Sequence, residues 1–169
     1  MISKIAASLF ILLLFIAPVL SVQGCKDKEG GSKQKIDDNR MRYSEEDFFR
    51  AVKSGNTGKV ELLIKEGINV NAKDKNGYTA LLTASEQADF EMARLLIDNG
   101  ADVNAGDKDG YTPLMYVAYS GNIDIAKMLI KNGADVNARD KDRWTALMFA
   151  RIEKRAAMVE LLKKSGAGK

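Results

Sequence analysis

The chain of 169 residues contains no histidine and only one cysteine, Cys25. Histidine is the commonest general base and metal ligand in proteins, so the usual nucleophile–base dyads and metal sites lose a member. A single cysteine cannot form a disulfide within the chain, so folding does not depend on internal cross-links. The sequence also lacks a glycine-rich loop that would hold a phosphate group. These absences predict a protein that is not an enzyme and needs no cofactor.

The chain also lacks a strong excess of charge of one sign. It has 26 lysine and arginine residues against 23 aspartate and glutamate residues, giving a net charge of +3. A protein that binds nucleic acid electrostatically usually carries a basic stripe, so we expect no nucleic-acid partner. With 46% hydrophobic and 29% charged residues, the composition is that of a soluble globular chain.

The amino-terminal segment has the layout of a secretory signal over residues 1–24. Lys4 is positively charged, residues 5–17 are almost wholly apolar, and small residues follow. The segment ends in Val22-Gln-Gly-Cys25, which resembles a bacterial lipobox, although Gln23 is unusual in it. The resemblance implies cleavage before Cys25 and lipidation of its sulfur. Simple secretion, an uncleaved anchor and an unmodified thiol remain as alternatives, because the apolar run is barely long enough to span a bilayer.

Residues 25–42 are predicted to be a flexible tether that begins at the lipidated Cys25. This segment is rich in charge and glycine and has Ile36 as its one branched apolar residue, so it cannot bury a core. As a coil, it would reach roughly 23 Å. The expected location is the periplasm, anchored to a membrane, and Lys26 after the cysteine favours the outer membrane. A secreted or soluble periplasmic protein is the alternative.

A period of 33 residues governs the rest of the chain. At this spacing threonines, leucines, glycines and asparagines recur: Thr79, Thr112 and Thr145; Leu81, Leu114 and Leu147; Gly100, Gly133 and Gly166; Asn71, Asn104 and Asn137. A fixed period of this length indicates a stack of similar units, none of which buries its apolar face alone. Such a stack presents an extended surface and not a single catalytic cleft.

The unit around Thr112 shows how each repeat is built. The Thr112 hydroxyl can cap a helix whose first residue is Pro113, because the missing proline N–H would be unpaired there. We expect this helix to run to about Ser120 and to stop at Gly121. A second helix is expected over residues 123–131, followed by a left-handed stop at Gly133.

This unit resembles an ankyrin repeat through Gly110-Tyr-Thr-Pro-Leu114, Gly121-Asn122, Met128-Leu-Ile130 and Asn132-Gly-Ala-Asp-Val-Asn-Ala138. The resemblance implies an all-α repeat solenoid of helix–turn–helix units joined by β-turn or hairpin loops. The units are an amino-terminal cap at 43–72, repeats at 73–105 and 106–138, and a carboxyl-terminal cap at 139–169. Ser44 and Asp47 form a capping-box-like start to the first unit.

Two departures from the ankyrin pattern affect packing and stability. The usual histidine after Thr-Pro-Leu is replaced by Leu82, Met115 and Met148, and we expect both methionines to fill the core. Ala88, Arg143 and Lys154 stand where turn glycines are expected. Each would cost on the order of 1 kcal/mol if its backbone stays left-handed. The fourth unit is therefore expected to be the least stable.

Acidic residues recur in the turns but predict no metal site. Asp107-x-Asp109 and Asp140-x-Asp142 lack the twelve-residue loop and terminal glutamate of a calcium site. They alternate with lysines and arginines along the turns. We interpret them as solvated turn carboxylates.

The ankyrin resemblance implies a partner-binding surface on the turn tips and on the concave face of each first helix. The positions carried over are Lys75, Asn76, Tyr78, Glu86, Gln87, Lys108, Asp109, Tyr111, Tyr119, Ser120, Lys141, Asp142, Trp144, Ile152 and Glu153. Tyr78, Tyr111 and Trp144 recur at the period, so they are expected to form an aromatic ladder with Tyr119 beside it. Aromatic rings are typical interface anchors. Packing between neighbouring turns is the alternative role for these rings.

Together these features predict a monomeric, non-enzymatic module that binds a protein in the bacterial cell envelope. Secretion signal, lipobox, tether and repeat stack follow one another in a consistent order along the chain. A narrower alternative is an inhibitor or immunity factor for an envelope hydrolase. Another is a structural or stress-protective scaffold without a single partner.

Overall fold

The computed structural model describes residues 43–168, so the predicted signal, Cys25 and tether lie outside the described residues. The described part forms eight α-helices: α1 Glu45–Lys53, α2 Thr57–Lys65, α3 Ala80–Glu86, α4 Phe90–Asp98, α5 Pro113–Ser120, α6 Ile123–Lys131, α7 Ala146–Ile152 and α8 Ala156–Lys164. None of these helices is long and apolar enough to cross a membrane.

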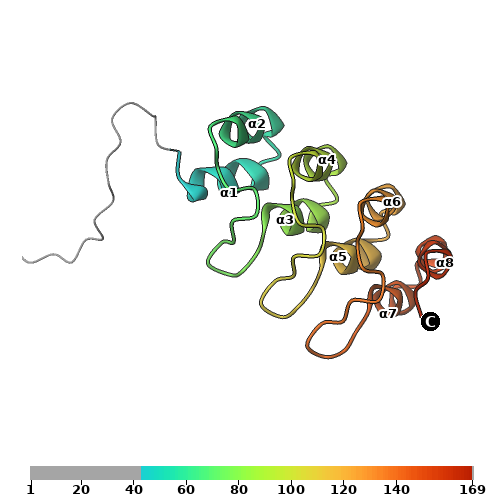
Figure 1. Ribbon diagram of the computed structural model, residues 1–169. Coiled ribbons are helices and arrows are strands. Elements are labelled where there is room, and N and C mark those ends of the chain that lie inside the picture. The colour runs from blue at the N-terminus through green and yellow to red at the C-terminus, as the bar shows by residue number, and fades with distance from the viewer. Residues whose placement is uncertain (1–42, 169) are drawn as a thin grey trace, which may run out of the picture. The chain divides into compact units, whose positions relative to one another are not determined.

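The helices are arranged in two parallel rows (Figure 1). One row contains α1, α3, α5 and α7, and the other contains α2, α4, α6 and α8. Each helix packs against its hairpin partner and against the equivalent helix of the next unit, as α5 does with α6, α3 and α7. Long loops project from the first row in one direction. The predicted all-α repeat solenoid is confirmed.

The helix starts follow from short polar side chains at the caps. Ser44 and Asp47 form the predicted capping box, in which the Asp47 N–H donates to Ser44 Oγ at 3.1 Å. The hydroxyls of Thr79 and Thr145 likewise accept backbone N–H groups of α3 and α7. Thr112 differs: α5 begins where predicted, but its buried hydroxyl has no hydrogen-bond partner. The Met115 N–H donates instead to the Thr112 carbonyl oxygen at 3.0 Å.

The core is a continuous apolar layer between the two rows of helices. Side chains at equivalent positions of successive units are fully or almost fully buried, among them Leu81, Leu114 and Leu147, and Leu96, Leu129 and Leu162. Because each unit covers the apolar face of its neighbour, the 33-residue period is a record of burial.

Met148 corrects the expectation that both methionines fill the core. Leu82 and Met115 are buried, whereas the Met148 side chain is 43% exposed. The position faces the next unit, so α5 and α7 cover the earlier residues. No unit follows α7 and α8 among the described residues, and Met148 is left uncovered on that side.

Hydrogen bonds between consecutive loops explain why asparagine recurs. Asn104 Nδ2 donates to the Gly133 carbonyl oxygen at 3.1 Å, and Asn104 Oδ1 accepts from the Asp135 N–H at 2.8 Å. Asn71 and Asn137 make the same pair of bonds to the unit that follows each of them. Each asparagine thus links the backbone of one repeat to the next.

Candidate functional site

The surface formed by α1, α3, α5, α7 and the tips of the long loops is called the inner face below. At each tip an aspartate side chain fixes an aromatic residue four positions later. Asp Oδ1 accepts the backbone N–H of that residue, at 2.9 Å for Asp74 and Tyr78, 3.0 Å for Asp107 and Tyr111, and 2.8 Å for Asp140 and Trp144. The loops therefore present Tyr78, Tyr111 and Trp144 at equivalent places in three successive repeats.

These three residues belong to a longer chain of rings that crosses the inner face. Tyr116 on α5 lies between Tyr78 and Tyr111, with ring-centre distances of 6.0 and 5.9 Å. Phe149 on α7 lies between Tyr111 and Trp144, with distances of 5.5 and 5.3 Å. These distances are typical of favourable aromatic pairs. The sequence interpretation missed Tyr116 and Phe149, although they are 33 residues apart and share one repeat position.

The ring chain combines both roles expected for the aromatic ladder. Tyr78 and Tyr111 are half-buried against the neighbouring helical rings, so they pack between repeats. Trp144 is 36% exposed and Tyr119, at the end of α5, is 55% exposed. The exposed aromatic surface is therefore concentrated toward the carboxyl-terminal end of the inner face.

A chain of hydroxyl groups joins the rings in the third unit. The hydroxyls of Tyr78 and Tyr116 are 2.5 Å apart, and the Tyr116 hydroxyl donates to Asp107 Oδ2 at 2.9 Å. Burial and these two hydrogen bonds raise the pKa of Tyr116 well above its ordinary value, so it remains a donor.

The fourth unit lacks the equivalent hydroxyl because Phe149 occupies the position of Tyr116. Asp140 Oδ2, the counterpart of Asp107 Oδ2, is buried and has no hydrogen-bond partner among the described residues. The side chain of Asp140 as a whole is buried, which corrects its interpretation as a solvated turn carboxylate. Asp109 and Asp142 are exposed as expected, and Asp107 is half-buried.

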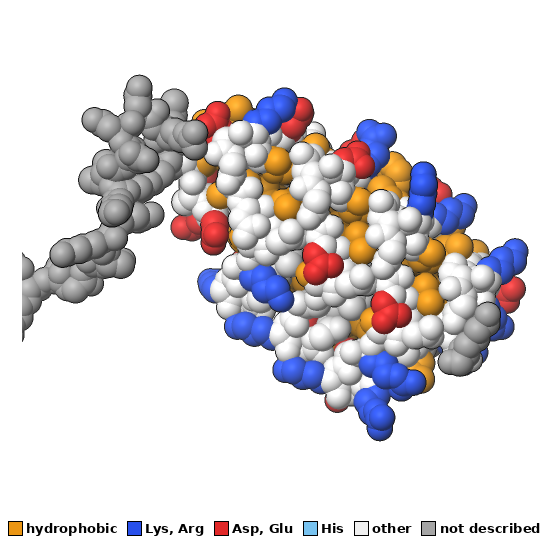
Figure 2. Space-filling view, viewed as in Figure 1, with side chains coloured by type: hydrophobic (Ala, Val, Ile, Leu, Met, Phe, Trp, Pro, Cys, Tyr) orange, Lys and Arg blue, Asp and Glu red, His pale blue; other side chains and the backbone are white. Residues whose placement is uncertain are grey.

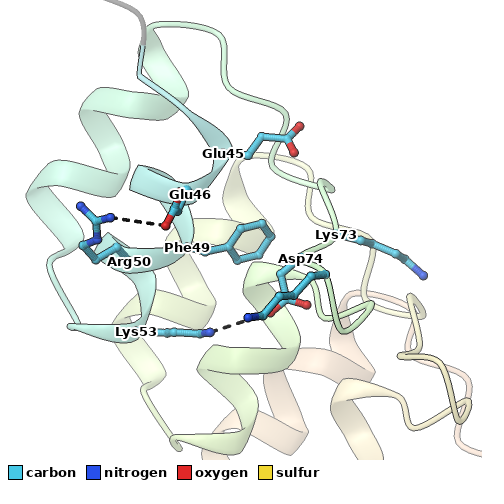
Figure 3. A pocket seen from close by; sticks show the side chains of 8 residues that line it. Glu45, Glu46, Phe49, Arg50, Lys53, Lys73 and Asp74 are labelled. Carbon is cyan, nitrogen blue, oxygen red and sulfur yellow. Dashed lines mark ion pairs between the residues drawn. The ribbon is translucent and has the colours of Figure 1, made fainter. Parts of the chain in front are cut away.

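Three hollows lie along the inner face. The first, of about 540 Å³, is at the amino-terminal end and is lined by charges of both signs around Phe49 (Figure 3). Arg50 pairs there with Glu46 at 3.6 Å, and Lys53 pairs with Asp74 at 3.8 Å. The second, of about 390 Å³, is lined by Lys53, Asp74, Asn76, Tyr78, Thr83, Glu86 and Gln87. Both contain mutually neutralising charges.

The third hollow, of about 410 Å³, is mainly aromatic and apolar. It is lined by Tyr111, Tyr119, Asp142, Trp144, Phe149, Ile152 and Glu153. Its two charged lining residues are both acidic. Burial and the nearby carboxylates, first those of Asp140 and Asp142, raise the pKa of Tyr111 above its ordinary value.

Comparison with protein-family models finds a match described as "Ankyrin repeats (3 copies)" over residues 48–140 and again over residues 106–169. The chain belongs to the ankyrin-repeat family. Ankyrin repeats generally bind other proteins, and proteins of this family are typically not enzymes. A search of curated proteins found no significant match to this sequence.

Most of the ankyrin positions carried over from the sequence line one of the three hollows. Lys75 lines the first; Asn76, Tyr78, Glu86 and Gln87 line the second; Tyr111, Tyr119, Asp142, Trp144, Ile152 and Glu153 line the third. The sequence interpretation did not identify Phe49, Lys53, Asp74 and Phe149 as lining residues. No periodic signal identifies Phe49 or Lys53, because the first repeat departs most from the template.

The other four carried-over residues make contacts within the ankyrin stack. Lys108 Nζ donates to the Lys75 carbonyl oxygen at 2.8 Å, and Lys141 Nζ lies 3.2 Å from Asp109 Oδ1. The Ser120 hydroxyl donates to the Val117 carbonyl oxygen at 3.2 Å. Lysine and arginine side chains also gather along the edge where the loops end (Figure 2). The loop lysines therefore hold neighbouring repeats together.

Proposed function

We propose that this ankyrin-repeat protein captures a partner protein on its inner face, with the third hollow as the centre of the contact. The observation that carries this proposal is the position of the exposed apolar side chains. Six large hydrophobic residues are exposed, and four of them, Tyr119, Trp144, Met148 and Ile152, come from α5, α7 and the loop between them. Exposed apolar groups gathered on one side mark an interaction surface, and tryptophan and tyrosine are frequent anchors.

The rigidity of the ring chain supports the same conclusion. Trp144 is held by its backbone bond to Asp140 and by the Phe149 ring, so little side-chain freedom is left to lose. A surface that is already ordered binds with a smaller entropic cost. The mechanism is therefore complementarity between a preformed face and its partner, without chemistry on the partner.

The test compares two pairs of exposed residues on opposite rows of helices. Tyr119→Ala with Trp144→Ala removes the proposed anchors, while Leu62→Ala with Phe90→Ala removes similar apolar surface from α2 and α4. We expect the first pair to reduce recovery of cross-linked partner from intact cells by about tenfold or more, with unchanged helical circular dichroism. Equal recovery from both variants would contradict the proposed face.

We also propose that the protein acts in the bacterial cell envelope, held at a membrane through lipid on Cys25. The charge and apolar pattern of residues 1–24 and the position of the only cysteine support this proposal. The outer membrane is the preferred site, on the basis of Lys26. Labelled fatty acid should enter the wild-type chain and not Cys25→Ala, which should leave the membrane fraction. A wild-type chain found only in the soluble or secreted fraction would contradict the anchor.

A further inference from the structure

The third hollow differs from the others in charge, and this difference points to the chemistry of its ligand. The first hollow is lined by Arg50, Lys53, Lys73 and Lys75 as well as by acids. The groove between α4 and α6 on the outer row is also lined by both signs, through Arg94, Asp98, Asp124, Lys127 and Lys131. In the third hollow, Asp142 and Glu153 are the charged lining residues, and no lysine or arginine of the described part lines it.

Neither acid of this hollow is neutralised within residues 43–168. Asp142 and Glu153 take part in no ion pair there, in contrast to Asp109, which is paired with Lys141. The nearest arginine to this region is engaged elsewhere, because Arg155 Nε donates to the Tyr119 carbonyl oxygen at 3.2 Å. Asp140 adds a buried carboxylate with one oxygen unpaired below the rings. The raised pKa of Tyr111 is consistent with this accumulation of negative charge.

The walls of the hollow favour the same kind of ligand as its charge. Tyr111, Tyr119, Trp144 and Phe149 surround it, and Trp144 and Tyr119 have exposed ring surface. The face of an aromatic ring carries negative electrostatic potential and attracts a cation, most strongly for tryptophan. A guanidinium group is planar and weakly hydrated, so it stacks on such rings while donating hydrogen bonds to carboxylates at the rim.

We propose that the third hollow binds an arginine side chain of the partner protein. The guanidinium group stacks against Trp144, and Asp142 and Glu153 accept hydrogen bonds from its N–H groups. This inference rests on the proposed function and adds to it the chemistry of the partner: a protein surface with a projecting arginine. The remaining exposed apolar residue of the hollow, Ile152, contacts the methylene stem.

The experiment uses Trp144 as the reporter, because it is the only tryptophan in the chain. The full-length protein is titrated with acetyl-Gly-Arg-Gly amide and with the same peptide containing citrulline, which has the shape of arginine without its charge. We expect a saturable change in Trp144 fluorescence with the arginine peptide, at least about tenfold weaker binding of the citrulline peptide, and weakening by salt. Equal binding of the two peptides would overturn the proposal.

Paired variants separate a specific effect from a general effect of charge. Asp142→Asn with Glu153→Gln should weaken binding of the arginine peptide by about tenfold, whereas Asp98→Asn with Asp124→Asn changes net charge equally and should leave it unchanged. Tighter binding of choline than of the arginine peptide would overturn the choice of a protein side chain. If the Asp142 and Glu153 variant still captures partner normally while the Tyr119 and Trp144 variant does not, the arginine assignment fails and the proposed function stands.

Discussion

At the scale of single residues, one hydroxyl group distinguishes the third repeat from the fourth. The Tyr116 hydroxyl joins Tyr78 to Asp107 Oδ2, so each polar atom in that chain has a partner. Phe149 preserves the ring packing with Tyr111 but leaves Asp140 Oδ2 buried and unpaired. A buried acceptor without a donor loses its bonds to water and gains none in return, so the fourth repeat carries that cost.

Restoring the hydroxyl should stabilise the protein. In Phe149→Tyr, the new group can donate to Asp140 Oδ2 as Tyr116 donates to Asp107 at 2.9 Å. We expect the free energy of unfolding to rise by about 1–2 kcal/mol, measured by urea denaturation. The reverse change, Tyr116→Phe, should lower it by a similar amount. A destabilised Phe149→Tyr together with a neutral Tyr116→Phe would contradict this account of the two sites.

At the scale of elements, the loops are held to one another by side chains that recur at the repeat period. Asn71, Asn104 and Asn137 each bond to the backbone of the following repeat, and Lys73 Nζ donates across the same boundary to the Gly106 carbonyl oxygen at 2.9 Å. These bonds fix the spacing of the loop tips. The tips carry Tyr78, Tyr111 and Trp144, so the geometry of the inner face depends on them.

Removing one of these links should weaken the coupling between repeats. Asn104→Ala removes two bonds to the fourth repeat, from Nδ2 and to Oδ1. Because the site is exposed and water replaces part of the loss, we expect a decrease of about 1 kcal/mol in the free energy of unfolding. Asn132→Ala is the control, since its Nδ2 bonds only within its own hairpin, to the Met128 carbonyl oxygen at 2.8 Å. A loss no larger than the control's would argue against a coupling role.

At the scale of the whole described unit, the stack is weakest at its carboxyl-terminal end. Arg143 and Lys154 have left-handed φ values of 65° and 54°, and Ala88 in the second unit has 55°. This confirms the condition on which the predicted cost depended. A side chain at Gly110, which corresponds to Arg143, would put its Cβ 3.2 Å from Asp140 Cα in the next loop. No loop follows that of Arg143 among the described residues, so a side chain fits there and only the backbone strain remains.

Hydrogen exchange should therefore be fastest in residues 139–167, relative to the other units. Arg143→Gly and Lys154→Gly should each slow it, because glycine removes a left-handed strain of about 1 kcal/mol. The measurement is amide exchange followed by mass spectrometry of peptides from each repeat. Finding residues 139–167 to be the best-protected segment would contradict the prediction.

The periodic sequence determined the helices, their caps and the buried leucines, because each of these depends on neighbours within one repeat or at a fixed spacing. It predicted the start of α5 at Pro113 and the break at Gly121 for that reason. It also placed Tyr78, Tyr111 and Trp144 at equivalent positions. Local chemistry repeated at a constant step is visible without coordinates.

The tertiary structure alone decided which of these residues are buried and which remain open. Met115 and Met148 occupy the same repeat position, yet only Met115 is covered by a following unit. Likewise, Tyr116 and Phe149 became part of the ring chain only when α5 and α7 were placed beside the loop tips. Burial and charge pairing depend on what packs next to a residue, and the end of a stack has a neighbour on one side only.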